Sequence, residues 1–226
     1  MSIEAAKKAA GINGADLVQD GMIVGLGTGS TAFYFIERLI QRCREGLKIK
    51  GVASSEQSLK QASAGGIPIV DINQISAIDM TVDGADEIDP LKRMIKGGGG
   101  ALLREKIVAS MSSEMVVIVD ESKLVSKLGM CKLPVEIIPF GYLSTIKKLE
   151  HFGFKGTIRK TAEGAFFSTD NHNWIFDVQY DTPTDDPERD EALIISIPGV
   201  IDTGYFFNLA GRVVISFLDG QIVVQD

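Results

Sequence analysis

The chain has 226 residues, of which 45% are hydrophobic and 23% are charged, which is the composition of a folded protein with a sizeable core and excludes a disordered chain. Its 23 Lys and Arg against 30 Asp and Glu give a net charge of -7, the wrong sign for general binding to nucleic acid or an anionic membrane. No apolar stretch has the length of a membrane span or signal peptide, and Cys43 and Cys131 lack a metal-binding spacing, so we expect a cytoplasmic protein with reduced thiols.

The first half of the chain alternates short apolar runs with amphipathic stretches, which is typical of βαβ units feeding a mostly parallel sheet. The predicted strands are residues 22–26, 49–53, 67–70, 80–82 and 115–119, and the predicted helices are residues 31–44, 56–64 and 101–111. Ahead of them, the two poor helix formers Gly11 and Gly14 are expected to interrupt a first helix. The fold class is therefore α/β, with a Rossmann-like, mostly parallel sheet and helices on both faces.

The pattern changes near Pro134 and Pro139, which bracket a short strand-like run that leaves the first sheet. Beyond it the sequence predicts helices at 142–152 and 187–196, a strand at 156–160, and a hairpin over 165–178 that turns at 170–173. This mixture indicates a small α+β (ferredoxin-like) domain, after which 213–217 and 222–224 rejoin the main sheet. The predicted domains are residues 1–131 with 203–226, and residues 132–202.

The loop after the first predicted strand has the sequence Gly-Leu-Gly-Thr-Gly-Ser-Thr at residues 25–31. Ligands bind beyond the carboxyl ends of parallel strands, and glycines and hydroxyls that open a helix are typical of a phosphate site. Ser30 replaces the third glycine of a dinucleotide fingerprint, and no Lys precedes the Ser-Thr pair as in a P-loop. A monophosphate ester therefore fits better than NAD or ATP. The alternative is a tight turn that needs glycine for its backbone alone.

An acidic cluster at residues 83–89 follows the fourth predicted strand. Ionised Asp83 and Asp86 are acceptor-only groups, which favours hydrogen bonds from sugar hydroxyls. Magnesium is a weaker alternative, because the spacing does not match a calcium loop and Lys96 would compete for the carboxylates. A plain Asx turn with a helix cap is the other alternative. No metal site is predicted.

The run Lys-Gly-Gly-Gly-Gly-Ala-Leu-Leu-Arg-Glu-Lys at residues 96–106 places four glycines before a predicted helix. The glycines remove every side chain where a substrate approaches the backbone. Helical spacing places Glu105 on an apolar face with Val108, which favours a carboxylate that points into a cleft as a general base. The alternative is a solvated Glu in a first helical turn. Lys96 and Lys123 are the cations expected to meet a negative oxygen, unless they are ordinary surface lysines.

These groups together suit the movement of a proton next to the carbonyl of a sugar phosphate. In an aldose–ketose isomerisation, one base takes a proton from C2 and returns it to C1 of a cis-enediolate, so a single Glu is enough and no cofactor is required. Histidine catalysis is not expected, because His151 and His172 lie outside all of the clusters. Residues 27–31 also lack the Gly-x-Ser-x-Gly order of a nucleophile elbow.

The three motifs, in this order, closely resemble those of type A ribose-5-phosphate isomerases, and the likeness spans nearly the whole chain. They are VGLGTGST at 24–31, VDGADEI at 82–88 and KGGGGALLREK at 96–106. The resemblance implies interconversion of D-ribose 5-phosphate and D-ribulose 5-phosphate in the pentose phosphate pathway, without metal or cofactor, by a homodimer or homotetramer. It implies that Glu105 is the proton-transferring base, assisted by Asp83, Asp86 and Lys96. The substrate-binding residues it implies are Thr28, Gly29, Ser30, Thr31, Asp83, Gly84, Ala85, Asp86, Lys96, Gly97, Gly98, Gly99 and Lys123.

The departures from the family pattern lie away from the proposed chemistry. Cys131 and Lys132 stand where the family usually has an aromatic residue and a proline, and residues 209–212 lack an acid common there. Because one fold serves several functions, two rivals stay open. A coenzyme A transferase would use a Glu as a covalent nucleophile and needs clustered basic residues, which are not seen. A non-catalytic sugar-phosphate-sensing module would not need Glu105 together with both aspartates.

Overall fold

The computed structural model describes residues 1–226, and the chain divides into two compact units. Unit 1 comprises Met1–Ala85, Arg104–Leu124 and Asn208–Asp226, and unit 2 comprises Asp86–Leu103 and Val125–Phe207. The domain boundaries predicted from the sequence stay a prediction. None of the helices combines the length and the apolar character that crossing a membrane requires.

Unit 1 is built on a six-stranded sheet with the strand order β13-β12-β6-β3-β1-β2. Its strands are β1 (Ile23–Leu26), β2 (Lys50–Ala53), β3 (Met80–Asp83), β6 (Met115–Asp120), β12 (Ala210–Ser216) and β13 (Ile222–Gln225). Every neighbouring pair is parallel except β12 with β13. The predicted mostly parallel sheet is therefore confirmed, and the carboxyl ends of β1, β2, β3 and β6 meet at one edge of this sheet.

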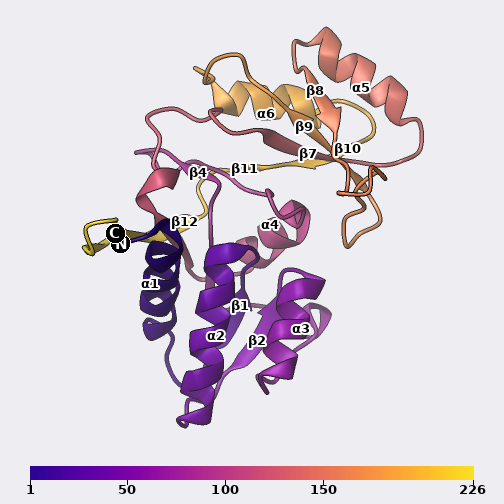
Figure 1. Ribbon diagram of the computed structural model, residues 1–226. Helices are drawn as coiled ribbons and strands as arrows, with labels where there is room; N and C mark the ends of the chain where they lie inside the picture. Colours follow the sequence, from indigo (N-terminus) through magenta and orange to yellow (C-terminus); the bar gives the residue numbers. More distant parts are fainter. The chain divides into compact units, whose positions relative to one another are not determined.

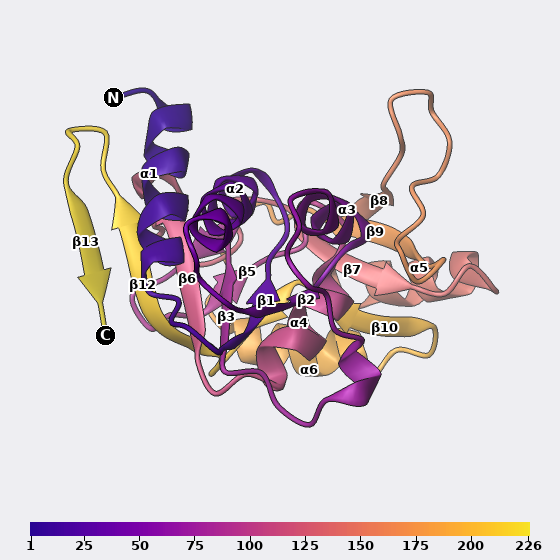
Figure 2. The ribbon, with the colours of Figure 1, turned by 90° about the horizontal axis from the view of Figure 1, so that it is seen from below.

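Helices cover both faces of this sheet, as predicted. Helices α1 (Ile3–Asp16) and α2 (Ser30–Arg44) lie side by side along one face, where α3 (Glu56–Ala64) follows α2, and α4 (Leu102–Ser110) lies on the other face (Figure 2). Phe35 and Leu39 of α2 pack with Val24 and Leu26 of β1 in the larger core. On the opposite face, Val108 of α4 packs in a smaller buried cluster.

Unit 2 holds a four-stranded antiparallel sheet with the strand order β10-β7-β9-β8. Its strands are β7 (Leu133–Ile137), β8 (Gly156–Ile158), β9 (Trp174–Val178) and β10 (Val200–Thr203). Helices α5 (Tyr142–His151) and α6 (Pro187–Ile195) pack on this sheet (Figure 1). There Leu149 and Ile194 join Val135 and Phe176 in one core. The predicted second α+β region and both of its helices are confirmed.

A second, three-stranded antiparallel sheet in unit 2 was not predicted. It has the strand order β11-β5-β4, with β4 at Glu87–Ile88, β5 at Met94–Ile95 and β11 at Tyr205–Phe206. Strands of two residues carry no detectable alternation of apolar and polar residues, so only their pairing reveals them. Glu87 and Ile88 of the acidic cluster form β4, and Lys96 directly follows β5.

The strand predicted at residues 67–70 is wrong. The segment is extended, but it joins the edge of the large sheet only through an isolated bridge between Gly51 and Ile69. The amide of Gly51 donates to the carbonyl of Pro68 at 2.8 Å, and the amide of Val70 donates to the carbonyl of Gly51 at 2.9 Å. Because Pro68 has no N–H, the ladder does not extend further. Similarly, the hairpin predicted at 165–178 forms a strand only over β9, and two single bridges pair its first arm.

The expected interruption of the first helix is also wrong, because α1 runs unbroken from Ile3 to Asp16. Both of its inner glycines are buried. A Cβ added to Gly11 would lie 2.7 Å from the backbone nitrogen of Phe35 and 2.9 Å from Cβ of Tyr34. The glycines therefore allow α1 to approach α2 closely, and this packing outweighs their poor helix propensity.

Replacing Gly11 with Ala is expected to lower the free energy of unfolding by about 1–2 kcal/mol, because the new methyl group meets backbone and the two helices must separate. The gain in helix propensity, about 1 kcal/mol, does not offset this overpacking. Urea denaturation measures the change. A Gly11→Ala variant more stable than the native protein would show that the close approach of α1 to α2 is not required.

Candidate functional site

The loop between β1 and α2 is held against the end of β3 by hydrogen bonds. The amide of Gly27 donates to the carbonyl of Val82 at 3.0 Å. The amides of Thr28 and Gly84 both donate to Oδ1 of Asp83, at 2.9 and 2.8 Å. A Cβ on Gly27 would lie 2.3 Å from that same oxygen, so only glycine fits there. Asp83 is buried, and its first role is to shape this loop.

A cluster of hydroxyl groups surrounds Thr28, and the sequence reading missed most of it. Oγ1 of Thr28 lies 2.8 Å from Oγ of Ser54 and donates to Oγ of Ser55 at 2.9 Å. Ser58 at the start of α3 lies 3.4 Å from the same atom. The available signal was that Ser54 and Ser55 directly follow β2, at the carboxyl edge of the sheet. Their hydroxyls orient Thr28.

The N-terminus of α2 has the properties of an anion site. The helix begins at Ser30, after Gly29 with φ +105°, and no side chain caps its first turn. Gly29 and Ser30 are exposed, while Thr31 is buried. The amide groups of a first helical turn attract negative charge because they lack intrahelical partners and lie at the positive end of the helix dipole.

Glu105 lies in the first turn of α4 and is 3% exposed. The buried face of the helix also includes Leu102, Val108 and Ala109, whereas Ile107 is exposed, so the predicted helical face is confirmed. The neighbouring Arg104 forms an ion pair with Glu56 of α3 at 3.2 Å. The structure therefore places the carboxylate of Glu105 on the buried face of α4.

In unit 2, the glycine loop, defined as residues 96–100, forms a tight turn. The amide of Gly100 donates to the carbonyl of Gly97 at 2.9 Å, and these two residues have φ of +84° and +96°. Both are buried, while Gly98 and Gly99 are exposed. The amide of Gly98 donates to Oδ2 of Asp86 at 2.7 Å. Asp86 and the glycine loop, both predicted site elements, are thus in direct contact.

Lys96 opens the glycine loop and is 2% exposed. Its amide donates to the carbonyl of Gly204 at 2.8 Å, and its Nζ lies 5.4 Å from the centre of the Phe206 ring. Next to Phe206, the hydroxyls of Tyr205 and Tyr180 share a hydrogen bond of 2.7 Å. Burial raises the pKa of both hydroxyls, so they stay neutral at physiological pH. Lys96 is therefore a buried cation on a rigid support, not an ordinary surface lysine.

The predicted residues divide between the units. Unit 1 carries Thr28, Gly29, Ser30, Thr31, Asp83, Gly84, Ala85, Glu105 and Lys123, and unit 2 carries Asp86, Lys96, Gly97, Gly98 and Gly99. Lys123 ends the 3-10 helix Glu121–Lys123 after β6 and is half-buried. The chain crosses between units after Ala85 and after Leu103, so Asp83, Asp86 and Glu105 lie next to these crossings in sequence. No group of three or more His, Cys, Asp or Glu side chains is arranged to hold a metal ion.

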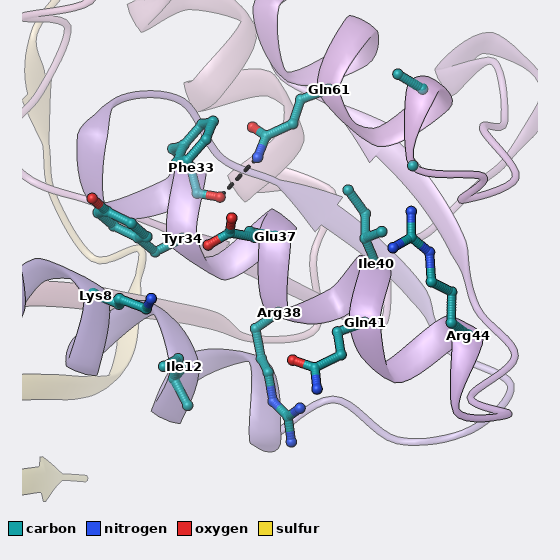
Figure 3. Close-up of a pocket in the computed structure, with 12 residues that line it drawn as sticks. Lys8, Ile12, Phe33, Tyr34, Glu37, Arg38, Ile40, Gln41, Arg44 and Gln61 are labelled. Atoms are coloured by element: carbon teal, nitrogen blue, oxygen red, sulfur yellow. Dashed lines mark hydrogen bonds between the residues drawn. The ribbon is translucent and has the colours of Figure 1, made fainter.

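A cavity of about 660 Å³ lies elsewhere in unit 1 and is lined by residues of α1, α2 and the end of α3 (Figure 3). None of the residues predicted for the site lines it. Two of its polar side chains are already engaged, since Gln61 donates to the carbonyl of Phe33 at 2.8 Å and Arg38 pairs with Asp16 at 3.4 Å. This cavity is therefore separate from the residues predicted for the site.

Comparison with known proteins identifies close relatives over the full chain. The sequence model of the family "Ribose 5-phosphate isomerase A (phosphoriboisomerase A)" matches residues 50–220. A protein of Protochlamydia amoebophila named ribose-5-phosphate isomerase A is 54% identical, with 96% of this chain and 93% of that protein covered. The solved ribose 5-phosphate isomerase of Plasmodium falciparum is 39% identical with a TM-score of 0.95, covering 99% of this chain and 98% of that one. A further solved D-ribose-5-phosphate isomerase, in complex with phospho-erythronic acid, is 37% identical with a TM-score of 0.95 and 100% coverage of both chains.

Proposed function

We propose that Glu105 carries out the proton transfer by which this chain, which belongs to the ribose 5-phosphate isomerase A family, interconverts D-ribose 5-phosphate and D-ribulose 5-phosphate. The observation that carries the proposal is the buried carboxylate of Glu105 on α4, directly after the glycine loop in sequence. This reaction of the pentose phosphate pathway needs one base and no redox step. Relatives at this identity are named as enzymes, which argues against the non-catalytic sensing alternative.

Glu105 acts on the open-chain sugar. Its carboxylate takes the proton from C2 of the aldose, and the electron pair of the broken C–H bond forms the C1–C2 double bond of a cis-enediolate while the π pair of the C1 carbonyl moves onto O1. The hydroxyl proton of O2 passes to O1. An electron pair on O2 then forms the C2 carbonyl, and the pair of the C1–C2 double bond takes the proton back from Glu105 at C1, which yields the ketose. A positioned base of this kind supplies about 10²- to 10⁴-fold in rate.

Lys96 and Asp86 support the reaction by interacting with oxygen atoms of the substrate. The buried ammonium of Lys96 stabilises the negative enediolate oxygen, a contribution of about 10²- to 10³-fold for a preorganised donor. Asp86 holds the amide of Gly98 and accepts hydrogen bonds from sugar hydroxyls. Asp83, already bonded to two amides through Oδ1, binds a hydroxyl on the same principle.

The phosphate is bound by the first turn of α2. Free amides and the hydroxyls of Thr28, Ser30 and Thr31 match its acceptor oxygens, and Lys123 adds positive charge. Gly29, Gly84, Ala85, Gly97 and Gly99 complete the substrate-binding set, because small residues let a ligand approach the backbone. The ligand is thereby fixed at its phosphate end while the chemistry takes place at C1 and C2.

The test is to run the native enzyme on ribose 5-phosphate in D₂O with EDTA present. Proton transfer through an enediolate predicts solvent deuterium at C1 of the ribulose 5-phosphate formed, with part of the substrate's C2 proton retained because one base carries it. Nuclear magnetic resonance of the product measures both. A product that contains no solvent deuterium would indicate a hydride shift and contradict the proposal.

We also propose that the enzyme is a cytoplasmic homodimer or homotetramer, as the family resemblance implies. Sedimentation equilibrium of the purified protein distinguishes these states from a monomer, which would contradict this part of the proposal. Neither assembly is needed for the proton transfer described above.

A further inference from the structure

We propose that Arg159 is a positioning residue for the isomerisation, which holds the glycine loop in its reactive shape and is itself aimed by Asp177. The inference rests on the proposed function, which assigns the glycine loop to the substrate. It adds Arg159 and Asp177 from the second half of the chain. Arg159 lies 61 and 62 positions after Gly98 and Gly97, whose carbonyls it contacts.

The guanidinium of Arg159 is hydrogen-bonded on two sides. Its Nη1 donates to the carbonyls of Gly97 and Gly98, both at 3.0 Å. Its Nε donates to Oδ2 of Asp177 at 3.0 Å, and its Nη2 donates to Oδ1 at 2.5 Å. The side chains are only 17% and 8% exposed, and Cζ lies 5.8 Å from the centre of the Phe167 ring. A bidentate ion pair that is shielded from solvent holds the guanidinium in one orientation.

The sheet of unit 2 explains how the pair is placed. Arg159 directly follows β8, and Asp177 lies in β9, where its register partner is Thr157. The amide of Arg159 donates to the carbonyl of Ile175 at 2.8 Å, so its backbone is anchored as well. The fork therefore projects from a rigid hairpin toward the loop.

The glycine loop needs such a clamp because four successive glycines have more conformational freedom than any other sequence. Arg159 donates hydrogen bonds to the adjacent carbonyls of Gly97 and Gly98, and Asp86 accepts a hydrogen bond from the amide of Gly98. The turn also depends on glycine itself, because Gly97 and Gly100 have positive φ, which residues with side chains rarely adopt. The clamp holds the loop before substrate arrives, and preorganised backbone of this kind costs no rearrangement during the reaction.

The alternative is that Arg159 and Asp177 only brace the hairpin β8–β9. A brace affects folding stability, whereas a clamp on the loop affects the catalytic step. Because the phosphate is assigned to α2, which Arg159 does not touch, the clamp predicts a large change in kcat and a small change in KM. A misplacement of about 1 Å in a catalytic element costs about 10²-fold in rate.

The experiment compares Arg159→Gln and Arg159→Lys with the control Arg212→Lys, which alters another bidentate ion pair, to Glu114 in unit 1. We expect kcat to fall about 10²-fold for Arg159→Gln and about 10-fold for Arg159→Lys, which keeps the charge but not the fork. KM for ribose 5-phosphate should change less than about 3-fold, in keeping with an intact phosphate site. The control should keep the native kcat.

Two inhibitors provide a second readout. Phospho-erythronic acid carries a planar carboxylate that resembles the two enediolate oxygens, and inorganic phosphate reports on the phosphate end alone. Arg159→Gln should weaken inhibition by phospho-erythronic acid about tenfold or more, while inhibition by inorganic phosphate stays unchanged. Equal loss of both, or native kcat in both Arg159 variants, would overturn the inference and leave the pair as a brace.

A Gly98→Ala variant separates failure of this inference from failure of the proposed site. Its new Cβ would lie 2.7 Å from Oδ1 of Asp86, so it distorts the loop directly. Full activity in Gly98→Ala would remove the glycine loop from the substrate site and with it the proposed assignment. Loss of activity in Gly98→Ala with native activity in both Arg159 variants would overturn the role of Arg159 alone. If Arg159→Gln does not fold, Arg159→Lys decides the question, because it retains a cation opposite Asp177.

Discussion

Replacing Glu105 with Gln is expected to lower kcat for ribose 5-phosphate by about 10²- to 10⁴-fold. The amide keeps the shape of the side chain on the buried face of α4 but does not accept a proton from C2. KM should change much less, because the phosphate and the hydroxyls keep their partners. The measurement is the conversion of ribose 5-phosphate to ribulose 5-phosphate with EDTA present.

Two further variants test whether the loss in Glu105→Gln comes from the missing base. Glu37→Gln, on the exposed side of α2, makes the same chemical change away from the site and should keep native activity. Glu105→Asp retains the carboxylate but withdraws it by one methylene, so its activity should lie between the native enzyme and Glu105→Gln. Native kcat in Glu105→Gln would show that another residue is the base.

Replacing Asp83 with Ala is expected to lower kcat/KM about 10²-fold and the free energy of unfolding by about 1–3 kcal/mol. The reason is that Oδ1 of Asp83 accepts hydrogen bonds from the amides of both Thr28 and Gly84. Without it, both donors lose their partner and the loop between β1 and α2 loses its shape. Steady-state kinetics and urea denaturation measure the two effects.

Asp83→Asn separates the two roles of this side chain. The amide oxygen still accepts both backbone N–H groups, so stability should return to near the native value, whereas the lost charge keeps kcat/KM low. The matched control is Asp79→Ala at the opposite end of β3, where Oδ2 accepts the amide of Ile23 at 2.7 Å. It should lose stability but not activity. Native kcat/KM in Asp83→Asn would make Asp83 a purely structural residue.

Local patterns were sufficient to predict the elements that carry the proposed site residues. The alternation of apolar runs and amphipathic stretches predicted the parallel sheet with helices on both faces, because side-chain period follows directly from backbone geometry. Glycines after β1, acids after β3 and the buried face that holds Glu105 were all visible in short windows of sequence. Each of these features depends on residues that are neighbours in the chain.

Only the tertiary structure brought together residues that are distant in sequence. It placed Ser54 and Ser55 on Thr28, paired β4 with β5 and β11, and showed that Gly11 permits helix contact instead of breaking a helix. It also placed Arg159 on the carbonyls of Gly97 and Gly98. Such contacts are set by which strands pair and in which register, and a one-residue shift would redirect every side chain. The sequence alone therefore determined which side chains we propose as reactive groups, and the packing of distant segments decided how the loops that carry them are held.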